Sequence, residues 1–419
     1  MNKIIKYPFS QLYDMASGIS STKEQAGHGS PFVSFSTVFN NYFLPDALPD
    51  LMDTSIKEQE TYSIKEGDIL ITRTSETIDE LAMSCVAVKD YPRATYSGFT
   101  KRLRPKTAGI AYHKYLAFYL RSQLFRKAVT NNAFMTLRAS FNEDIFSFLN
   151  LYLPEYKEQV KIGDMLYSME QKIQLNKRIC AELEAMAKTL YDYWFTQFDF
   201  PNAEGKPYRS SGGEMVWNDQ LKREIPKGWT PGTISSLMKI ENTSVNPQKL
   251  GNALMEHYSI PAFDANHNPA YEEAGTIESG KYVVDPECIL TSKLNPHFKR
   301  LWDPYCDTEN AICSTEFIVY RPRTAWTRPF CYAVLNSEAF YAHMVGKATA
   351  STGSRKRIQP DVSASFELAI PDEKTMRAFV ELYAPIMEKQ TALYKENCEL
   401  TKLRDWLLPV LMNGQATVE

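Results

Sequence analysis

Two long stretches of the chain, 217 residues apart, carry mainly apolar side chains at the same alternating steps of three and four residues. The first series is Ile162, Leu166, Met169, Ile173, Asn176, Cys180, Leu183, Ala187, Leu190 and Trp194. Adding 217 to each number gives Phe379, Tyr383, Ile386, Gln390, Leu393, Asn397, Leu400, Arg404, Leu407 and Leu411. Such steps are typical of a coiled-coil seam, whereas a helix that only covers a core carries a broader apolar stripe. The two stretches are therefore predicted to be long helices that pair with each other.

Some forty residues of helix span about 60 Å, and antiparallel pairing of two such helices would hold two globular parts at opposite ends. The polar seam residues Asn176, Gln390, Asn397 and Arg404 lower the stability of the pair and can fix its register. Pro385 is expected to kink the second helix or to split it. The simpler alternative is that each helix packs only on its own domain.

Shorter matches outside the helices have the same spacing. "YSGFTKRLRPK" from Tyr96 faces "CSTEFIVYRPR" from Cys313, and "LYLPE" from Leu151 faces "LAIPDE" from Leu368, while "GDILIT" and "PECILT" are shifted by 219. Each copy combines short β-type runs with a helical stretch and then enters its long helix through Pro154 or Pro371. The fold class predicted is mixed α/β: two α/β domains separated by two long antiparallel coiled-coil helices, with an internal pseudo-two-fold repeat.

The expected domain boundaries follow from this repeat. Residues 1–150 form the first α/β domain, 151–200 the first helix, 226–367 the second domain and 368–414 the second helix. Residues 201–225 are expected to be a surface linker, because Pro, Gly and Ser cluster there and the periodicity is lost.

Composition and motifs exclude several kinds of chemistry. A formal charge of −3 gives no overall attraction to nucleic acid, so a DNA surface would have to come from local basic clusters. The seven cysteines form no CxxC pair, the histidines are scattered, and neither a P-loop nor an HExxH helix occurs, so no metal or nucleotide site is expected. Without a signal peptide or an apolar run of membrane-spanning length, the chain is expected in the cytoplasm.

Four segments resemble a known family: "LPEYKEQVKIGDML", "LYDYWFTQF", "EIPKGW" and "LTKLRDWLLPVLMNG", each at the expected place relative to the repeat. Over essentially its whole length, the chain resembles the DNA-specificity (S) subunit of type I restriction-modification systems. The resemblance implies two target-recognition domains that each read one half of a bipartite DNA site, and helices that set the spacing. It also implies a non-catalytic chain without a cofactor of its own. Two adenine-N6 methyltransferase subunits would bind the helices and use S-adenosylmethionine, and motor-nuclease subunits can join.

Local clusters of cations and amides mark the candidate DNA contacts. The segment "KATASTGSRKR" and its repeat counterpart "TNNAFMTLRAS" combine such side chains with small residues, which suits phosphate and base contacts. The candidates are Arg73, Lys101, Arg102, Arg104, Asn131, Asn132, Arg138, Lys293, Lys347, Arg355, Lys356 and Arg357. The alternative for each cluster is an ordinary solvated surface, and along 100–105 the alternation of a strand exposes one set of side chains in any case.

Aromatic and apolar side chains on the two helices are the candidate contacts to the methyltransferase subunits. They are Tyr191, Trp194, Phe195, Phe198, Trp406 and Leu407. Two other functions stay open. Asn295-Pro296-His297-Phe298 partly matches the N-P-P-F motif of adenine methyltransferases, which would make the chain a stand-alone enzyme, and paired domains could also serve as a protein-binding scaffold.

Overall fold

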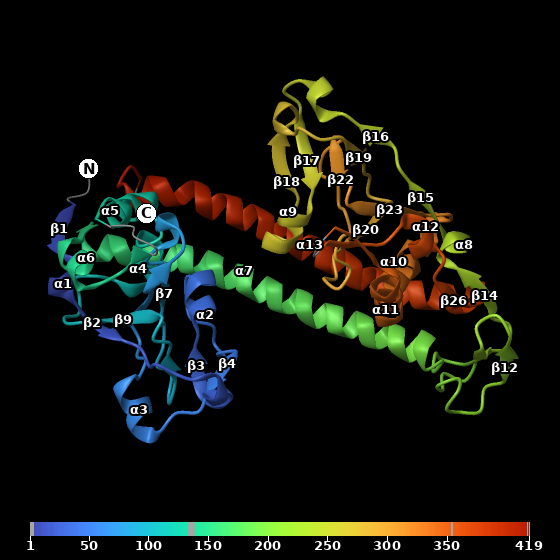
Figure 1. Ribbon diagram of the computed structural model, residues 1–419, viewed down its shortest axis with the longest axis horizontal. Coiled ribbons are helices and arrows are strands. Elements are labelled where there is room, and N and C mark those ends of the chain that lie inside the picture. The colour runs from blue at the N-terminus through green and yellow to red at the C-terminus, as the bar shows by residue number, and fades with distance from the viewer. Residues whose placement is uncertain (1–3, 133–138, 353–354, 417, 419) are drawn as a thin grey trace. The chain divides into compact units, whose positions relative to one another are not determined.

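The computed structural model describes residues 4–132, 139–352, 355–416 and 418. Contacts divide the chain into two compact units: unit 1 comprises Met1–Ile173 and Leu400–Glu419, and unit 2 comprises Gln174–Glu399. The two long helices, α7 (Tyr156–Tyr191) and α13 (Glu373–Met412), each contribute residues to both units (Figure 1). The domain ranges expected from the sequence treat each helix as a separate part and stay a prediction.

Unit 1 is built around an antiparallel four-stranded sheet. Its order is β2 (Tyr13–Ser17), β9 (Thr100–Pro105), β5 (Ile69–Thr72) and β7 (Ser84–Val86). Further strands are β4 (Asp50–Met52), β3 (Ala26–Val33) and β8 (Thr95–Tyr96) in one sheet, β1 (Ile5–Pro8) with β11 (Asn150–Leu153), and β6 (Thr74–Ser75) with β10 (Ala139–Ser140). The shorter helices are α1 (Phe9–Leu12), α2 (Phe35–Asn40), α3 (Ile56–Thr61), α4 (His113–Tyr119), α5 (Gln123–Asn132) and α6 (Glu143–Phe148).

Unit 2 repeats this strand pairing. Its four-stranded sheet has the order β15 (Met238–Glu241), β23 (Phe317–Pro322), β20 (Ile289–Ser292) and β21 (Leu301–Trp302). A second sheet contains β16 (Ser244–Val245), β19 (Lys281–Val283), β22 (Ala311–Ser314), β17 (Leu254–Tyr258) and β18 (Ala270–Glu273). Pairs are formed by β14 (Thr230–Thr233) with β26 (Glu367–Ile370), β24 (Thr349–Thr352) with β25 (Arg355–Arg357), and β12 (Met215–Asn218) with β13 (Arg223–Pro226). The shorter helices are α8 (Ile234–Leu237), α9 (Ile260–Asn266), α10 (Arg328–Asn336), α11 (Glu338–Lys347) and α12 (Pro360–Ala364).

The pairing of corresponding strands confirms the repeat predicted from the sequence. In unit 1, β9 pairs with β2 and β5 antiparallel, and β3 pairs with β8 parallel. In unit 2, β23 pairs with β15 and β20 antiparallel, and β17 pairs with β22 parallel. Both units therefore share one strand arrangement, and the mixed α/β class expected from the sequence is correct.

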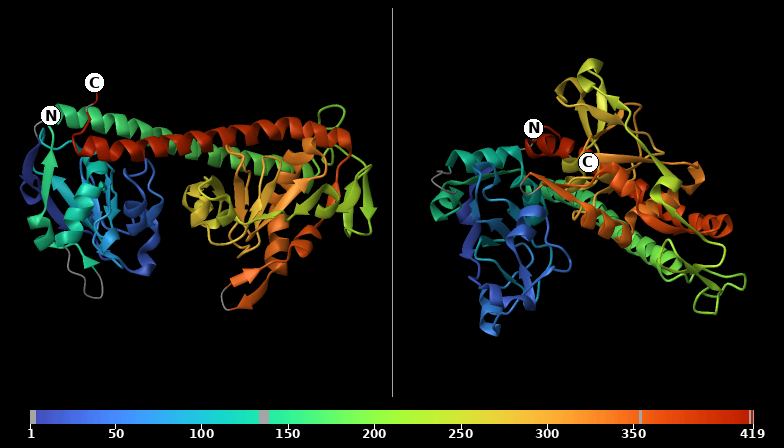
Figure 2. Two further views of the ribbon diagram at one scale, coloured as in Figure 1. Left: turned by 90° about the horizontal axis from the view of Figure 1, so that it is seen from above. Right: turned by 45° about the vertical axis from the view of Figure 1, so that its right-hand side comes forward.

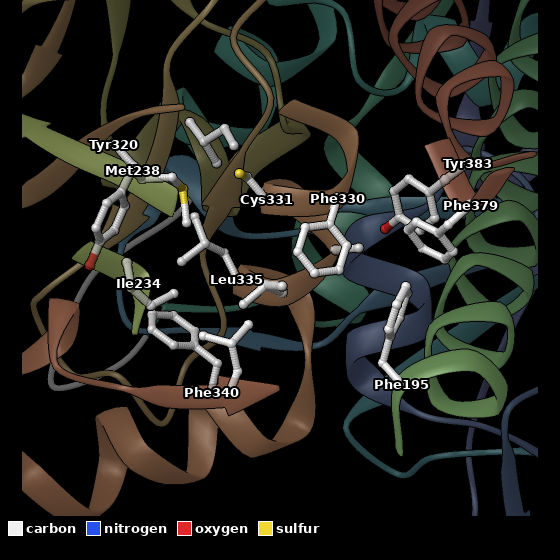
Figure 3. Close-up of a cluster of buried hydrophobic side chains, with 14 of the residues drawn as sticks. Phe195, Ile234, Met238, Tyr320, Phe330, Cys331, Leu335, Phe340, Phe379 and Tyr383 are labelled. Carbon is white, nitrogen blue, oxygen red and sulfur yellow. The ribbon is translucent and has the colours of Figure 1, made fainter. Parts of the chain in front are cut away.

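Each unit has its own apolar core, to which the long helices contribute. In unit 1, Ile162 and Leu166 of α7 and Leu411 and Met412 of α13 are buried with the side chains of β5, β9 and α4. In unit 2, Phe195 and Phe379 approach each other with ring centroids 4.7 Å apart, and Phe330 of α10 lies 5.1 Å from Phe195 (Figure 3). Burying an aromatic side chain of this kind stabilises a fold by about 1.5–3 kcal/mol.

Within each unit, α7 and α13 pair antiparallel. In unit 1, Arg404 Nη1 donates to Glu170 Oε2 at 2.8 Å, and the buried Ile162 shares a core with Leu411. In unit 2, Asn176 Nδ2 donates to Asn397 Oδ1 at 3.0 Å, and Gln390 Nε2 donates to the Cys180 carbonyl at 3.1 Å. As the residue number rises along α7, that of its partner falls along α13. The predicted seam is confirmed, and its polar residues bond to each other, to the facing backbone or, for Arg404, to the Glu170 carboxylate.

The predicted split at Pro385 does not occur, because α13 is one continuous helix from Glu373 to Met412. Pro385 has no N–H and cannot satisfy the carbonyl four residues earlier, on Glu381. Both Pro385 and Glu381 are exposed, so water can take the place of that hydrogen bond. At the same end of the pair, α7 continues into a π-helical turn, Asp192–Thr196, in which Phe195 contacts Phe379 of α13.

None of the helices in the described part of the chain combines the length and apolar character that a bilayer crossing requires.

Candidate nucleic-acid interface

Arg73 and Lys293 occupy the same place in their units, directly after the central strands β5 and β20. Arg73 N donates to the Phe99 carbonyl at 2.8 Å, and Lys293 N donates to the Glu316 carbonyl at 2.9 Å. On the other side, Phe141 N donates to the Arg73 carbonyl at 2.7 Å and Ile358 N to the Lys293 carbonyl at 3.1 Å. Four matched backbone hydrogen bonds thus present one cation per unit at an equivalent position.

In unit 1, Lys101 lies beside Arg73. Its Nζ donates to Ser17 Oγ at 2.8 Å. Partial burial, and then the positive charge of Arg73, lower the pKa of Lys101 below its ordinary value. Arg73 itself is exposed. Two neighbouring cations at the end of a sheet suit contact with a phosphate backbone, because both can donate while water still solvates them.

Arg102 and Arg104 have internal partners instead. Arg104 binds the fully buried Asp68 through two bonds, Nε to Oδ1 at 2.8 Å and Nη2 to Oδ2 at 2.6 Å. Arg102 Nη1 donates to the Ser63 carbonyl at 2.6 Å, and its guanidinium lies over the Tyr96 ring. Of the cations predicted on this strand, the structure thus leaves Lys101 next to Arg73 and commits Arg102 and Arg104 to holding unit 1 together.

The predicted asparagines of unit 1 lie in the last turn of α5. Both Asn131 and Asn132 are exposed, and Asn132 Nδ2 donates to the Ala128 carbonyl at 2.7 Å. Arg138 lies outside the described residues. The structure therefore provides accessible amides on this segment without bringing them into contact with Arg73.

In unit 2, the hairpin β24–β25 carries Arg355 and Lys356, both exposed. Figure 2, left, shows this hairpin projecting from the body of unit 2 on the side away from the long helices α7 and α13. Asn295 N donates to the Lys356 carbonyl at 2.7 Å, and Lys356 N donates to Asn295 Oδ1 at 2.9 Å. The hairpin is thereby fixed to the loop that follows β20, next to Lys293.

Two other predicted cations of unit 2 differ in their surroundings. Lys347 is exposed at the end of α11. Arg357 forms a bidentate pair with Glu316, at 3.0 Å from Nε and 2.8 Å from Nη2, and the pair raises the pKa of Arg357. Of the cations predicted in this unit, Lys293, Lys347, Arg355 and Lys356 can thus reach phosphates more readily than Arg357.

Most of the aromatic residues predicted to contact partners are core residues. Trp194, Phe195 and Phe198 are buried in the core of unit 2, and Tyr191 packs against that core. They cannot form an exposed surface there, because Phe379, Phe330 and Trp229 cover them. In unit 1, Trp406 is 67% exposed, and Leu407 is half-buried at the edge of the core.

Sequence reasoning missed an apolar groove on the helix pair of unit 2. It has a volume of about 680 Å³ and is lined by Ala185, Met186, Thr189, Leu190, Tyr193, Leu382 and Ile386. Met186 is 59% exposed. The residues 217 positions away from these lie on the helix pair of unit 1 and include Leu403, Trp406, Leu407, Val410, Met165 and Met169. The repeat therefore provides one apolar helical face in each unit, a signal that was available in the sequence.

Among the described residues, no group of three or more His, Cys, Asp or Glu side chains is arranged to hold a metal ion.

The architecture so far described consists of two α/β units of one design, and each unit includes part of both long helices. A family model for the type I restriction modification DNA specificity domain matches residues 11–185. The chain is 23% identical over 386 residues to the type I restriction enzyme MjaIX specificity subunit of Methanocaldococcus jannaschii, covering 88% of this chain and 82% of the relative. It is 22% identical over 446 residues to the HindI specificity subunit of Haemophilus influenzae, covering 92% and 94%.

A solved structure shares the fold. The type I restriction-modification S subunit from M. genitalium aligns with a TM-score of 0.61 at 14% identity, covering 98% of this chain and 96% of that one. Over most of its length, the chain is thus similar to type I restriction-modification DNA specificity subunits.

Proposed function

We propose that this chain reads DNA as the specificity subunit of a type I restriction-modification complex, with each unit contacting one half of a bipartite target. The observation that carries the proposal is the matched set of backbone hydrogen bonds that presents Arg73 in unit 1 and Lys293 in unit 2. A protein that meets two half-sites of a duplex in the same way needs two equivalent contact surfaces. Because its proposed target is DNA, the subunit is proposed to act in the cytoplasm.

As a specificity subunit, the chain directs catalysis rather than performing it, and S-adenosylmethionine would be bound by the partner methyltransferase. The rival reading as a stand-alone methyltransferase depends on Asn295 holding a target adenine. The Asn295 side chain instead accepts a hydrogen bond from Lys356 N and thereby fixes the β24–β25 hairpin. A structural role accounts for this residue.

The same proposal includes two methyltransferase subunits, one on each apolar helical face. The groove of unit 2 and the equivalent face of unit 1 offer exposed Leu, Met and aromatic side chains, and Met and aromatic residues are enriched in protein interfaces. Motor-nuclease subunits would join through the methyltransferases. The two long helices would act as the spacer that sets the distance between the half-sites.

The proposal is tested by removing cations in one unit at a time. The complex with methyltransferase subunits is first used to select its target from a randomised duplex pool. Arg73→Ala with Lys101→Ala should then weaken binding to one half-site, and Arg355→Ala with Lys356→Ala should weaken binding to the other. For each phosphate that a variant no longer neutralises, the slope of log K against log salt should become shallower by about 0.9. Fluorescence anisotropy at several salt concentrations measures both effects.

Lys157→Ala removes one exposed cation from the first turn of α7 and serves as the control. It should leave DNA binding unchanged. If the wild-type complex selects no sequence from the pool, or if both double variants bind the target with wild-type affinity, the proposed function is wrong.

A further inference from the structure

Phe99 is a large apolar side chain that protrudes from the candidate DNA surface of unit 1. It is 64% exposed, although its two sequence neighbours, Gly98 and Thr100, lie in a tightly packed turn. Arg73 N donates to its carbonyl, and Lys101 follows two residues later. The exposed phenylalanine therefore lies beside two cations of the candidate DNA surface.

The turn that carries Phe99 is rigid. Phe99 N donates to Ser97 Oγ at 3.2 Å, and Thr100 N donates to the Ser97 carbonyl at 2.9 Å. Gly98 N donates to the Ile19 carbonyl at 2.7 Å. A Cβ atom added at Gly98 would lie 2.9 Å from that same oxygen, and one at Gly18 would lie 2.1 Å from the Ser97 carbonyl oxygen. Close packing therefore fixes the backbone from which the Phe99 side chain projects.

A hollow of about 400 Å³ lies beside the ring. Its lining residues are Phe35, Phe39, Thr74, Ser75, Glu76, Glu80 and Phe99. Phe35 and Phe39 are stacked on each other with ring centroids 5.9 Å apart. Phe99 thus stands at the rim of a partly apolar surface rather than alone in solvent.

Unit 2 has a different side chain at the same backbone position. Glu316 N donates to Ser314 Oγ at 3.2 Å, as Phe99 N does to Ser97 Oγ, and the Glu316 carbonyl accepts from Lys293 N. The Glu316 carboxylate is paired with Arg357, and Ser140 is the residue of unit 1 that corresponds to Arg357. One unit therefore presents an apolar ring at this place, and the other presents an ion pair.

Base edges in a duplex differ in whether they offer an apolar group. In the major groove the 5-methyl group of thymine is the apolar feature, and the remaining groups there are hydrogen-bond donors and acceptors. A phenylalanine ring cannot satisfy those donors and acceptors, and it gains free energy by covering a methyl group. The neighbouring cations, Arg73 and Lys101, would hold the DNA backbone.

We propose that Phe99 is a specificity-determining residue that packs against the 5-methyl group of a thymine in the half-site read by unit 1. The inference rests on the proposed DNA-reading function and goes further by naming the residue and the base group. Since Glu316 occupies the equivalent place, unit 2 makes no such methyl contact. The two half-sites therefore differ at the base pair that faces this position.

The test is a cycle of two changes, one in the protein and one in the DNA. The full complex is measured with its selected target and with duplexes in which each thymine of the half-site read by unit 1 is replaced in turn by deoxyuridine, which lacks the methyl group. For the wild type, one replacement should weaken binding about fourfold, the value expected for one buried methyl-sized group. For Phe99→Ala, that replacement should have no effect, and affinity for the unmodified target should fall about 10- to 100-fold.

Phe148→Ala is the matched control, because Phe148 is also in unit 1 and is 68% exposed. It should keep the wild-type response to deoxyuridine, and circular dichroism should show that both variants are folded. If Phe99→Ala and the wild type respond equally to every replacement, the inference is overturned while the proposed function stands. If the wild type selects no target at all, the proposed function itself has failed.

Discussion

Neighbouring residues of the same type have different roles in this protein, as β9 shows. Lys101 lies beside the exposed Arg73, whereas Arg104 pairs with a carboxylate that has no exposure to solvent. A carboxylate buried without a partner is strongly unfavourable, so the Arg104–Asp68 pair stabilises unit 1. Basic residues near a DNA surface are thus not all available to DNA.

Arg104→Ala is expected to lower the free energy of unfolding by about 3 kcal/mol, the lower end of the range for breaking a buried pair, because the Arg104 side chain is 29% exposed. Denaturant unfolding followed by circular dichroism measures the change. Replacing both partners, with Arg104→Met and Asp68→Asn, should recover most of the loss, since no unpaired charge is then buried. A stable Arg104→Ala variant that fails to bind DNA would instead assign Arg104 to the interface.

The sequence predicted that a set of cations on this strand would be exposed, but it could not say which set. The answer depends on Asp68, which is 36 residues from Arg104 in the chain and meets it only in the folded sheet. For the same reason, the sequence did not reveal Phe99 as a candidate DNA contact. Its exposure results from a turn packed on Gly18 and Ile19, which a local pattern does not reveal.

At the scale of elements, the long helices were the most predictable part of the molecule. A seam with steps of three and four is a property of local helix geometry, and the partners Asn176–Asn397 and Cys180–Gln390 follow it in unit 2. The aromatic residues at the end of α7 were misjudged, because exposure on a helix depends on what packs against it. Phe379 of α13 and Phe330 of α10 cover Phe195 completely enough to make it a core residue.

The exposed faces of the helices can be tested separately. Met186→Glu with Leu382→Glu should remove one methyltransferase subunit from the complex, and Leu403→Glu with Trp406→Glu should remove the other. A charge placed in an apolar interface must be desolvated without a partner, which strongly weakens association. Native mass spectrometry counts the subunits directly.

Lys177→Ala with Arg178→Ala changes the net charge by the same amount at exposed positions of α7 and serves as the control. It should leave two methyltransferase subunits bound. A complex that keeps both subunits in all of these variants would place the partner contacts elsewhere on the chain.

At the scale of the whole molecule, the repeat was visible in the sequence because matched strands and helices preserve their spacing. The division of the chain into two compact units was harder to predict from the sequence. Unit 2 is one continuous stretch, Gln174–Glu399, whereas unit 1 combines residues from both sides of it. Such grouping depends on tertiary contacts, as between Ile162 and Leu411, that no short motif encodes. The bases read by each unit cannot be predicted from the sequence either, because side chains on distant segments meet at each surface.

The proposed spacer role predicts the effect of lengthening both helices together. Seven residues inserted after Ile173 in α7, with seven more before Leu400 in α13, would keep the seam in phase and add about 10 Å of helix. The unspecified part of the DNA target should then grow by about three base pairs, at 3.4 Å per pair, with both half-sites unchanged. Mapping methylated adenines in a host that carries the altered subunit measures the spacing.

An insertion in α7 alone shifts one seam past the other and should prevent assembly of an active complex. A doubly lengthened subunit that methylates the original target would show that the helices do not set the spacing.

The placement of Leu411 and Met412 in the core of unit 1 has a consequence for synthesis on the ribosome. Translation makes most of unit 1 first, yet its core lacks these two side chains until α13 has been made almost to its end. Unit 2 is contiguous and can close in the meantime, over tens of seconds at about 5–20 residues per second. Unit 1 is therefore completed after unit 2, although most of its residues precede unit 2 in the chain.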